Sequence, residues 1–244
     1  MTNCAMAAGR NMAKYTGRVA GSLLVLCISG FGVGHCWAST FNFYPSGSAG
    51  NTSLSSPQTY TSGANSITVY GYECDNGGGN DHACLSGTSL AGGVTVDSAS
   101  LYTKNDGTNE RGTGVANDPL GNNEISNKTF LDLDMTNLGA TSGTLTISSL
   151  QEDESFMFCY GNSNSGWNSN SCSAVFTGAG TNLTENFNLG AYHDISLIAV
   201  DGDVLLSSVA TTSSPVPEPG SLYLFGSGLV GLAGVVRRRL QAAS

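Results

Sequence analysis

The sequence predicts an all-β protein, with an antiparallel β-sandwich of the jelly-roll or galactose-binding-like type. Three observations support this fold class. The middle of the chain is rich in Gly, Ser, Thr and Asn and poor in strong helix formers, which favours strands and turns over helices. Short apolar runs that alternate with polar residues recur along it, and turns rich in Gly and Asn separate them. The Gly and Ser content is also typical of disorder, but the alternating runs favour folded strands.

The charges of the 244-residue chain are distributed unevenly. Its formal net charge is −9, yet residues 39–216 contain three basic and 17 acidic residues, which gives that part a net charge of −14. Nucleic-acid binding needs clustered Lys and Arg, so a nucleic-acid partner is excluded. The acidic balance suits an exported protein that stays soluble by charge repulsion and attracts cations.

Residues 1–38 have the organisation of a signal peptide. Basic residues precede the apolar stretch 19–33, and Cys36 and Ala38 place small residues at positions −3 and −1 before Ser39. We expect the Sec machinery to export the chain and signal peptidase to cleave it after Ala38. A permanent N-terminal anchor is the alternative.

Residues 39–210 are predicted to form one passenger domain. Its candidate strands, identified by alternation and β-branched content, are Ser66–Tyr72, Val94–Thr103, Phe130–Met135, Thr144–Leu150, Ser155–Tyr160, Ala174–Thr177, Asp194–Val200 and Asp203–Val209. Phe130–Met135 alternates apolar and acidic residues, as in a strand with one face in water. Asp201-Gly202 separates the last two strands and predicts a tight type I′ hairpin. The polar stretch Phe41–Ala64 is either an irregular lead-in or an edge strand.

Four cysteines lie in this domain: Cys74, Cys84, Cys159 and Cys172. An even number in an exported chain favours disulfides, and four cysteines allow three connectivities. We expect the sequence neighbours to pair, because each pair then closes a loop rich in Gly and Asn and contributes about 2–3 kcal/mol. Neither pair has the Cys-x-x-Cys spacing that is typical of metal ligands.

The segment Gly112–Ile125 concentrates oxygen atoms that could bind Ca²⁺. Ca²⁺ takes six to eight oxygen ligands from carboxylates, amides and carbonyls. The candidate ligands are Asn117, Asp118, Asn122, Asn123 and Glu124. Their spacing matches no EF-hand, so the segment is either a Ca²⁺ site or an Asx-rich turn. No other cofactor is indicated.

The loop 160–168 is a candidate carbohydrate site. It places Trp167 among amides and hydroxyls, and an aromatic face beside hydrogen-bonding groups suits a sugar ring. Tyr160, Asn162 and Asn164 are the other candidate contacts. The alternative is that Trp167 folds back and covers the core.

The sequence contains no complete catalytic site. The two histidines of the domain, His82 and His193, are expected in a solvated loop and at a strand edge. There is no Gly-x-Ser-x-Gly motif, and the acidic residues are scattered rather than paired as in glycosidases. We therefore expect a protein that is not an enzyme.

The C-terminal end consists of four consecutive parts. They are a polar linker at 211–215, the motif Pro217-Glu218-Pro219, an apolar stretch at 222–236 that contains four glycines, and the cluster Arg237-Arg238-Arg239. A helix over the apolar stretch rises roughly 25 Å, barely enough to cross the hydrocarbon core. The Arg cluster is expected to stay in the cytoplasm by the positive-inside rule, and the prolines keep the approach extended.

This order of parts, at residues 216–240, resembles the PEP-CTERM sorting signal of Gram-negative bacteria. The resemblance implies recognition by an exosortase, a membrane-embedded enzyme similar to cysteine transpeptidases, and removal of the tail near Pro-Glu-Pro. It also implies transient insertion into the inner membrane, followed by delivery to the cell surface or extracellular matrix. A single-pass anchor that is never cut is the alternative.

These features predict a non-catalytic surface or matrix protein that interacts with exopolysaccharide or with other matrix components. Two alternatives stay open. One is a lectin-like carbohydrate-binding module, with or without Ca²⁺. The other is a secreted hydrolase whose site has no recognisable motif.

Overall fold

The computed structural model describes residues 38–44, 51–75, 83–107, 109–163 and 166–212, together with 228, 229, 238 and 241. The signal peptide predicted at 1–38, apart from Ala38, lies outside this part of the chain. The Pro-Glu-Pro motif and nearly all of the predicted transmembrane stretch also lie outside it. Within the described part, no helix has both the length and the apolar character needed to cross a membrane.

The described body is built from antiparallel strands, and its described residues between 38 and 212 contain no helix. Sheet A has seven strands in the order β15-β11-β17-β9-β8-β2, with β1 also paired to β17. These strands are β1 (Ala38–Asn42), β2 (Thr52–Leu54), β8 (Leu101–Asn105), β9 (Arg111–Val115), β11 (Ser142–Ser148), β15 (Leu183–Asn188) and β17 (Leu205–Thr212).

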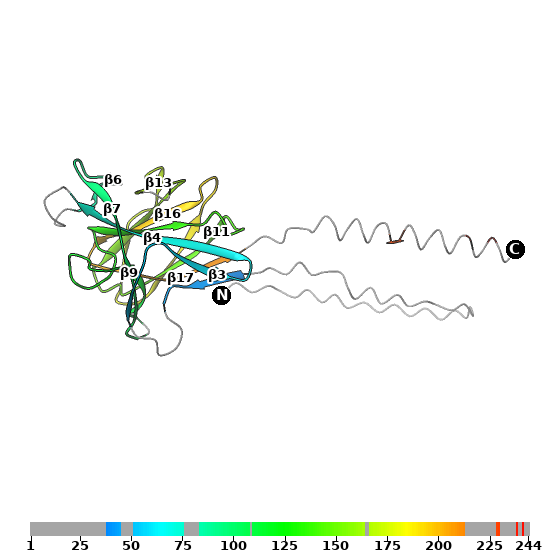
Figure 1. Cartoon of the computed structure of the whole chain (residues 1–244), viewed down its shortest axis with the longest axis horizontal. Helices are drawn as coiled ribbons and strands as arrows, with labels where there is room; N and C mark the ends of the chain where they lie inside the picture. The colour runs from blue at the N-terminus through cyan, green and yellow to red at the C-terminus, as the bar shows by residue number, and fades with distance from the viewer. Residues whose placement is uncertain are drawn as a thin grey trace. The chain divides into compact units, whose positions relative to one another are not determined.

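Sheet B has eight strands in the order β13-β12-β16-β10-β4-β3, with β14 paired to β12 and β7 paired to β4. These strands are β3 (Gln58–Ser62), β4 (Asn65–Asp75), β7 (Thr95–Ala99), β10 (Thr129–Asp134), β12 (Ser155–Gly161), β13 (Ser171–Cys172), β14 (Phe176–Thr177) and β16 (Asp194–Asp201). A small hairpin of β5 (Leu85–Ser86) and β6 (Ser89–Leu90) completes the body (Figure 1).

The two sheets enclose one hydrophobic core. Alternate residues of each strand point into it, so that Leu131 and Leu133 of β10 meet the same core as Leu145 and Ile147 of β11. All four side chains are fully buried, and burying a side chain of this size contributes about 1.5–3 kcal/mol. This arrangement confirms the predicted all-β class and antiparallel pairing, and two sheets around a shared core are what a β-sandwich requires.

Seven of the eight predicted segments coincide closely with observed strands, and the eighth, Val94–Thr103, is divided between β7 and β8. The stretch 41–64 holds the end of β1, β2 and β3, and the last two lie at sheet edges, as the edge-strand alternative predicted. Strands β9 and β15 were missed, and so were the two-residue strands β5, β6 and β13.

The predicted hairpin at Asp201-Gly202 is wrong. Strand β16 belongs to sheet B and β17 to sheet A, so this turn carries the chain from one sheet to the other. A type I′ turn needs a positive φ at both central residues, whereas here Gly202 has φ of 73° and Asp201 is not in that region. Val204 then pairs with Ile125 rather than with β16.

The outer face of sheet B carries a second layer. Tyr72, Phe130, Met157 and Ile198 form a separate buried cluster there, against which Trp167 packs. The prediction that Phe130–Met135 has one face in water is therefore wrong, since both Phe130 and Asp132 are fully buried. The loops that contain Cys84 and Trp167 exclude water from this face.

Candidate binding sites on the body

The two predicted disulfides are confirmed. Cys74 bonds to Cys84 with a Cα–Cα distance of 5.3 Å, and Cys159 bonds to Cys172 with a Cα–Cα distance of 4.0 Å. Three of these cysteines are buried in the outer cluster of sheet B, and Cys172 packs against it. The bonds thus hold the 83–94 and 162–172 loops against the sheet.

Trp167 folds back onto the sheet, as the alternative interpretation predicted. Its ring meets the Phe130 ring edge-on at a centroid distance of 5.4 Å, and its Nε1 donates a hydrogen bond of 2.9 Å to the carbonyl oxygen of Thr88. The indole is half-buried, and its N–H and one ring edge are already engaged within the protein.

Tyr160 and Trp167 lie on opposite faces of sheet B. Tyr160 packs against the main core and stacks on Tyr192 with ring centroids 6.2 Å apart, and its hydroxyl accepts a hydrogen bond from the backbone N–H of Asn188. The two aromatic rings cannot line one sugar platform. Asn162 accepts a hydrogen bond from the His193 backbone, and Asn164 lies outside the described residues.

The predicted Ca²⁺ segment begins with a strand rather than a loop, because residues 111–115 form β9. The Asp118 carboxylate accepts hydrogen bonds from the Ser126 hydroxyl and the Leu120 backbone N–H. Asn123 accepts one from the Asn117 backbone. These contacts are those of an Asx-rich turn.

The remaining two candidate Ca²⁺ ligands have partners of their own. Glu124 is buried and forms an ion pair of 2.5 Å with the Lys104 ammonium, and Asn122 donates a hydrogen bond to Asp203. Burial raises the pKa of Glu124 despite the opposing effect of Lys104. Lys104 thus supplies the positive charge that a metal ion would bring to this place.

The structure brings together an acidic group that the sequence left scattered. Asp132 and Asp134 of β10 lie opposite Ser196 and Asp194 of β16 in the antiparallel register. Residues two apart on a strand share a face, so the three carboxylates project from the same outer face of sheet B. We call Asp132, Asp134, His193 and Asp194 the acidic cluster.

Asp132 is the most enclosed member of the acidic cluster. Its Oδ1 accepts hydrogen bonds of 3.0 Å from both the Ser196 hydroxyl and the Asn168 side-chain amide, while its buried Oδ2 has no hydrogen-bond partner. Burial, and next the charge of Asp194, raise the pKa of Asp132 to about 8. This carboxyl therefore keeps its proton at neutral pH.

Asp194 and His193 form the exposed end of the acidic cluster. His193 Nδ1 lies 3.2 Å from Asp194 Oδ2, and its side chain is 46% exposed whereas that of Asp194 is 1% exposed. Burial raises the pKa of Asp194, and the charge of His193 opposes this shift. A Ser-His-Asp triad also needs a serine on the second imidazole nitrogen, and among the described residues no serine hydrogen-bonds to His193. His82 lies outside the described residues.

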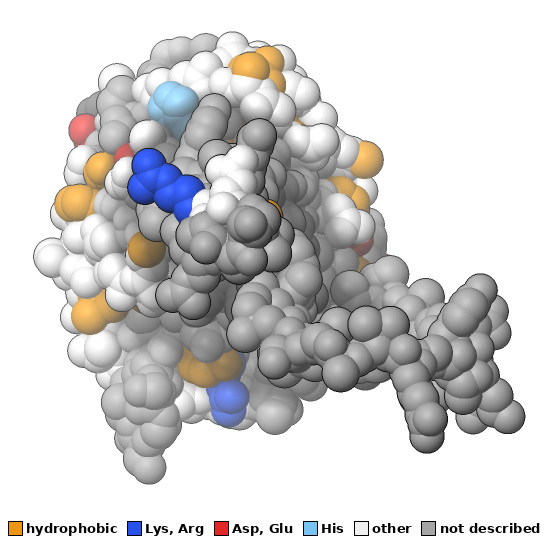
Figure 2. Space-filling model, turned by 90° about the vertical axis from the view of Figure 1, so that its right-hand side faces the viewer, with side chains coloured by type: hydrophobic (Ala, Val, Ile, Leu, Met, Phe, Trp, Pro, Cys, Tyr) orange, Lys and Arg blue, Asp and Glu red, His pale blue; other side chains and the backbone are white. Residues whose placement is uncertain are grey.

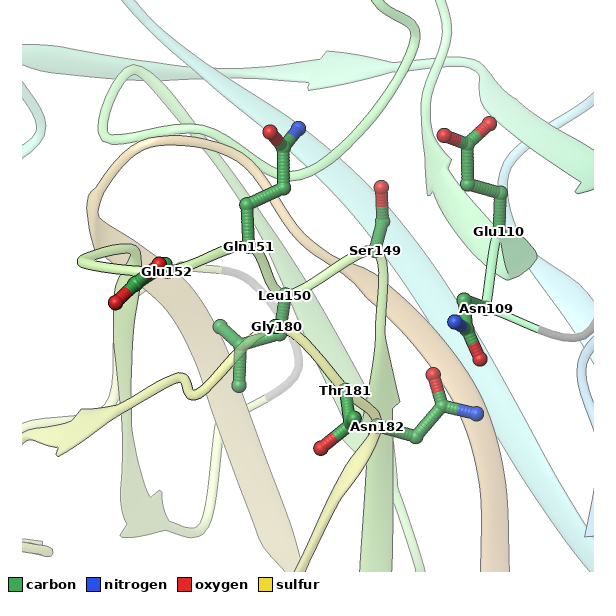
Figure 3. Close-up of a pocket in the computed structure, with 9 residues that line it drawn as sticks. All are labelled: Asn109, Glu110, Ser149, Leu150, Gln151, Glu152, Gly180, Thr181 and Asn182. Carbon is green, nitrogen blue, oxygen red and sulfur yellow. The ribbon is translucent and has the colours of Figure 1, made fainter.

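Three loops at one end of the body surround a pocket of about 230 Å³ (Figure 3). They connect β8 to β9, β11 to β12 and β14 to β15. The lining residues are Asn109, Glu110, Ser149, Leu150, Gln151, Glu152, Gly180, Thr181 and Asn182. Apart from Gly180 and the buried Leu150, all of them carry amide, hydroxyl or carboxylate groups, although carbon atoms form most of the exposed lining. We call it the polar pocket after these side chains.

Backbone hydrogen bonds fix the loops of the polar pocket. The Ser149 N–H donates to the Asn109 carbonyl at 2.6 Å, and the Gly178 N–H donates to the Glu154 carbonyl at 2.7 Å. Ser149 has φ of 58°, a conformation that is uncommon for residues other than glycine and that often marks functional sites. Figure 3 shows the Glu152 carboxylate directed away from the amides of Asn109 and Asn182.

Among the described residues visible in Figure 2, hydrophobic side chains lie as separate spots. Scattered spots of this kind are normal on a protein surface.

Residues 215–239 match the family model of the PEP-CTERM protein-sorting motif. The match begins three residues after Thr212, where β17 ends. The motif implies an exported protein that is held transiently in the membrane and processed by exosortase. Pro217, Glu218, Pro219, Arg237 and Arg239 lie outside the described residues, while Arg238 is described and exposed. No curated protein and no solved structure matches the chain.

Proposed function

We propose that this exported protein with a PEP-CTERM motif is a non-catalytic component of the cell surface or extracellular matrix, which binds exopolysaccharide. The observation that carries the proposal is the sorting motif placed directly after the last strand of a disulfide-bonded β body. In this proposal exosortase delivers the folded body to the surface, where the host's polysaccharide is the abundant partner. A jelly-roll or galactose-binding-like sandwich is the expected class of the body.

The polar pocket is the proposed contact with the polysaccharide. Its amides and hydroxyls can donate to and accept from sugar hydroxyls, and the apolar Leu150 forms part of its wall. At about 230 Å³ it is smaller than the roughly 300–1,000 Å³ of sites for drug-sized ligands, so it suits one sugar ring of a longer polymer. Weak contacts of this size become effective when many copies bind one polymer.

The absence of catalysis is part of the proposal. Asp132, whose pKa is raised to about 8, is fully buried beneath Asn168 and Ser196, so it cannot reach a substrate as a general acid. A lectin-like module built on Trp167 is less well supported, because its indole is committed to Phe130 and Thr88.

Binding of the exported protein to exopolysaccharide purified from its own host tests the proposal. The double variant Asn109→Ala/Thr181→Ala removes two exposed polar side chains from the pocket. Each lost hydrogen bond is worth about 0.5–1.5 kcal/mol, so we expect affinity to fall roughly five- to a hundredfold.

The matched control is Thr95→Ala/Ser98→Ala, which changes two exposed residues of β7 in sheet B. The control should bind like the wild type. If the pocket variant binds as tightly as the wild type, the pocket is not the contact site. If the wild type does not bind, exopolysaccharide is not the partner.

A further inference from the structure

Two carboxylates face each other across the β10–β16 pair at its end. Asp134 lies directly opposite Asp194, and like charges in this position destabilise a sheet. The ligand atoms of Asp134, His193 and Asp194 all lie within 4.8 Å of one another. Two carboxylates and one imidazole are therefore concentrated at this end of the strand pair.

The buried carboxylate of Asp194 lacks the partners that its burial requires. It is 1% exposed, Oδ1 has no hydrogen-bond partner, and Oδ2 has only the His193 imidazole, at 3.2 Å. Its charged neighbours are the imidazole of His193 and the carboxylate of Asp134, and within the described part of the chain no lysine or arginine pairs with the acidic cluster. A buried charge with so few polar contacts is strongly unfavourable, and a cation bound between these side chains would compensate it.

We propose that Asp134, His193 and Asp194 bind a divalent transition-metal ion, with Zn²⁺ as the best fit. Imidazole nitrogen and carboxylate oxygen are common Zn²⁺ ligands, with bonds of about 2.0–2.2 Å. Tetrahedral ligands at that distance are separated by roughly 3.3–3.6 Å, and His193 Nδ1 lies 3.2 Å from Asp194 Oδ2. Ca²⁺ fits less well because it requires six to eight oxygens.

The surrounding contacts hold these side chains in place. The His193 N–H donates to the Gly161 carbonyl at 3.2 Å, and its carbonyl accepts from the Met135 N–H at 2.8 Å. Asp134 Oδ1 accepts from the Thr136 N–H at 2.9 Å, which leaves Oδ2 for a metal. Supporting contacts of this kind orient the ligands of metal sites.

The fourth position of the proposed site faces solvent. His193 is 46% exposed, so a water molecule or a group from another molecule can complete the coordination. The inference is independent of polysaccharide binding, because the polar pocket is lined by other residues.

Zinc titration of the exported protein, first stripped with a chelator, tests this site. Calorimetry should show one ion bound per chain in the wild type. His193→Gln and Asp194→Asn should each weaken binding by at least about tenfold. The melting temperature of the wild type should rise with Zn²⁺, and that of Asp194→Asn should not.

Two control variants keep the result specific. Asp97→Asn changes an exposed aspartate of β7, and His82→Gln changes the other histidine of the domain; both should bind Zn²⁺ like the wild type. The site is refuted if the wild type binds no zinc, if both ligand variants bind it with unchanged affinity, or if Ca²⁺ binds in its place.

Discussion

Asp132 carries a carboxyl group that solvent does not reach. Ser196 and Asn168 donate to one of its oxygens, and the second oxygen has no partner. Its pKa is about 8 in the folded protein, against 3.8 as its ordinary value. The folded state therefore binds one more proton than the unfolded chain between these two values, which couples stability to pH.

We predict that the protein loses stability as pH rises from about 4 to about 8. Proton binding by Asp132 stabilises the folded state because its pKa is higher there than in the unfolded chain. This stabilisation is complete below about pH 4 and is lost as the pH rises to about 8. The free energy of unfolding falls by up to about 1.4 kcal/mol per pH unit. Urea denaturation at several pH values, with a chelator present, measures this slope.

The variant Asp132→Asn should reduce the dependence of the free energy of unfolding on pH. At pH 5 its stability should lie within about 1 kcal/mol of that of the wild type, because the buried amide replaces a protonated carboxyl whose O–H also lacks an acceptor. At pH 8.5 it should be the more stable protein. Parallel curves for the two proteins would show that Asp132 does not titrate in this range.

Two glycines explain why strand β9 escapes sequence reasoning. A Cβ atom at Gly112 would lie 2.5 Å from the carbonyl oxygen of Leu206, and one at Gly114 would lie 2.5 Å from the Cα of Glu124. Glycine is needed here so that neighbouring backbones can approach closely. In the sequence the same glycines favour a loop, which is how the Ca²⁺ segment was interpreted.

At the scale of elements, the 162–172 loop acts as a lid over sheet B. Cys159 and Cys172 fix its two ends, and Asn168 within it donates to Asp132. The described residues of the loop have no regular structure apart from β13, and the disulfide reduces the conformational freedom of this segment in the unfolded chain.

We predict that Cys159→Ala/Cys172→Ala lowers the free energy of unfolding by about 2–4 kcal/mol, as expected for a separation of 13 residues. Hydrogen exchange at the Asn168 and Ser196 amides should also become faster. Cys74→Ala/Cys84→Ala is the matched control, which should lose similar stability without faster exchange at Asn168. Slow exchange at Asn168 in the first variant would contradict the role of the lid.

Strand positions were predictable where side chains alternate with a period of two. Phe156 and Phe158 of β12 and Ile195 and Leu197 of β16 point into the core, and their spacing alone indicates strands. The division into sheets was not predictable in the same way. Asp201-Gly202 has the composition of a hairpin turn, but only the long-range pairing of β17 with β11 and β1 decides its path.

The disulfides followed from local loop closure, whereas the acidic cluster did not follow from any local pattern. Asp134 and His193 are almost 60 positions apart and become neighbours through the register of β10 and β16. The only local signal was the alternation of Phe130–Met135. That signal located the strand but could not show that loops cover its polar face.

At the scale of the whole molecule, the sorting motif predicts a processed product. We expect the protein purified from the surface of its own host to lack Arg237-Arg238-Arg239, because exosortase removes the tail near Pro217-Glu218-Pro219. Intact-mass spectrometry measures this directly. The variant Pro217→Ala/Pro219→Ala should keep the tail and accumulate in the membrane fraction, and a wild-type surface pool that retains the Arg cluster would contradict processing.

The two ends of the body pair with each other. Ser39, the first residue after the predicted cleavage, lies opposite Thr211 in the register of β1 and β17, and β17 is bonded to β11 on its other side. Any tension on the chain beyond Thr212 therefore enters along the axis of a strand that is bonded on both edges. When such a strand is pulled along its axis, its hydrogen bonds are loaded in shear and must break together. When a strand at a sheet edge is pulled sideways, its hydrogen bonds break one after another. A pull on the C-terminal end along the axis of β17 would therefore have to break the hydrogen bonds on both edges of this strand at once.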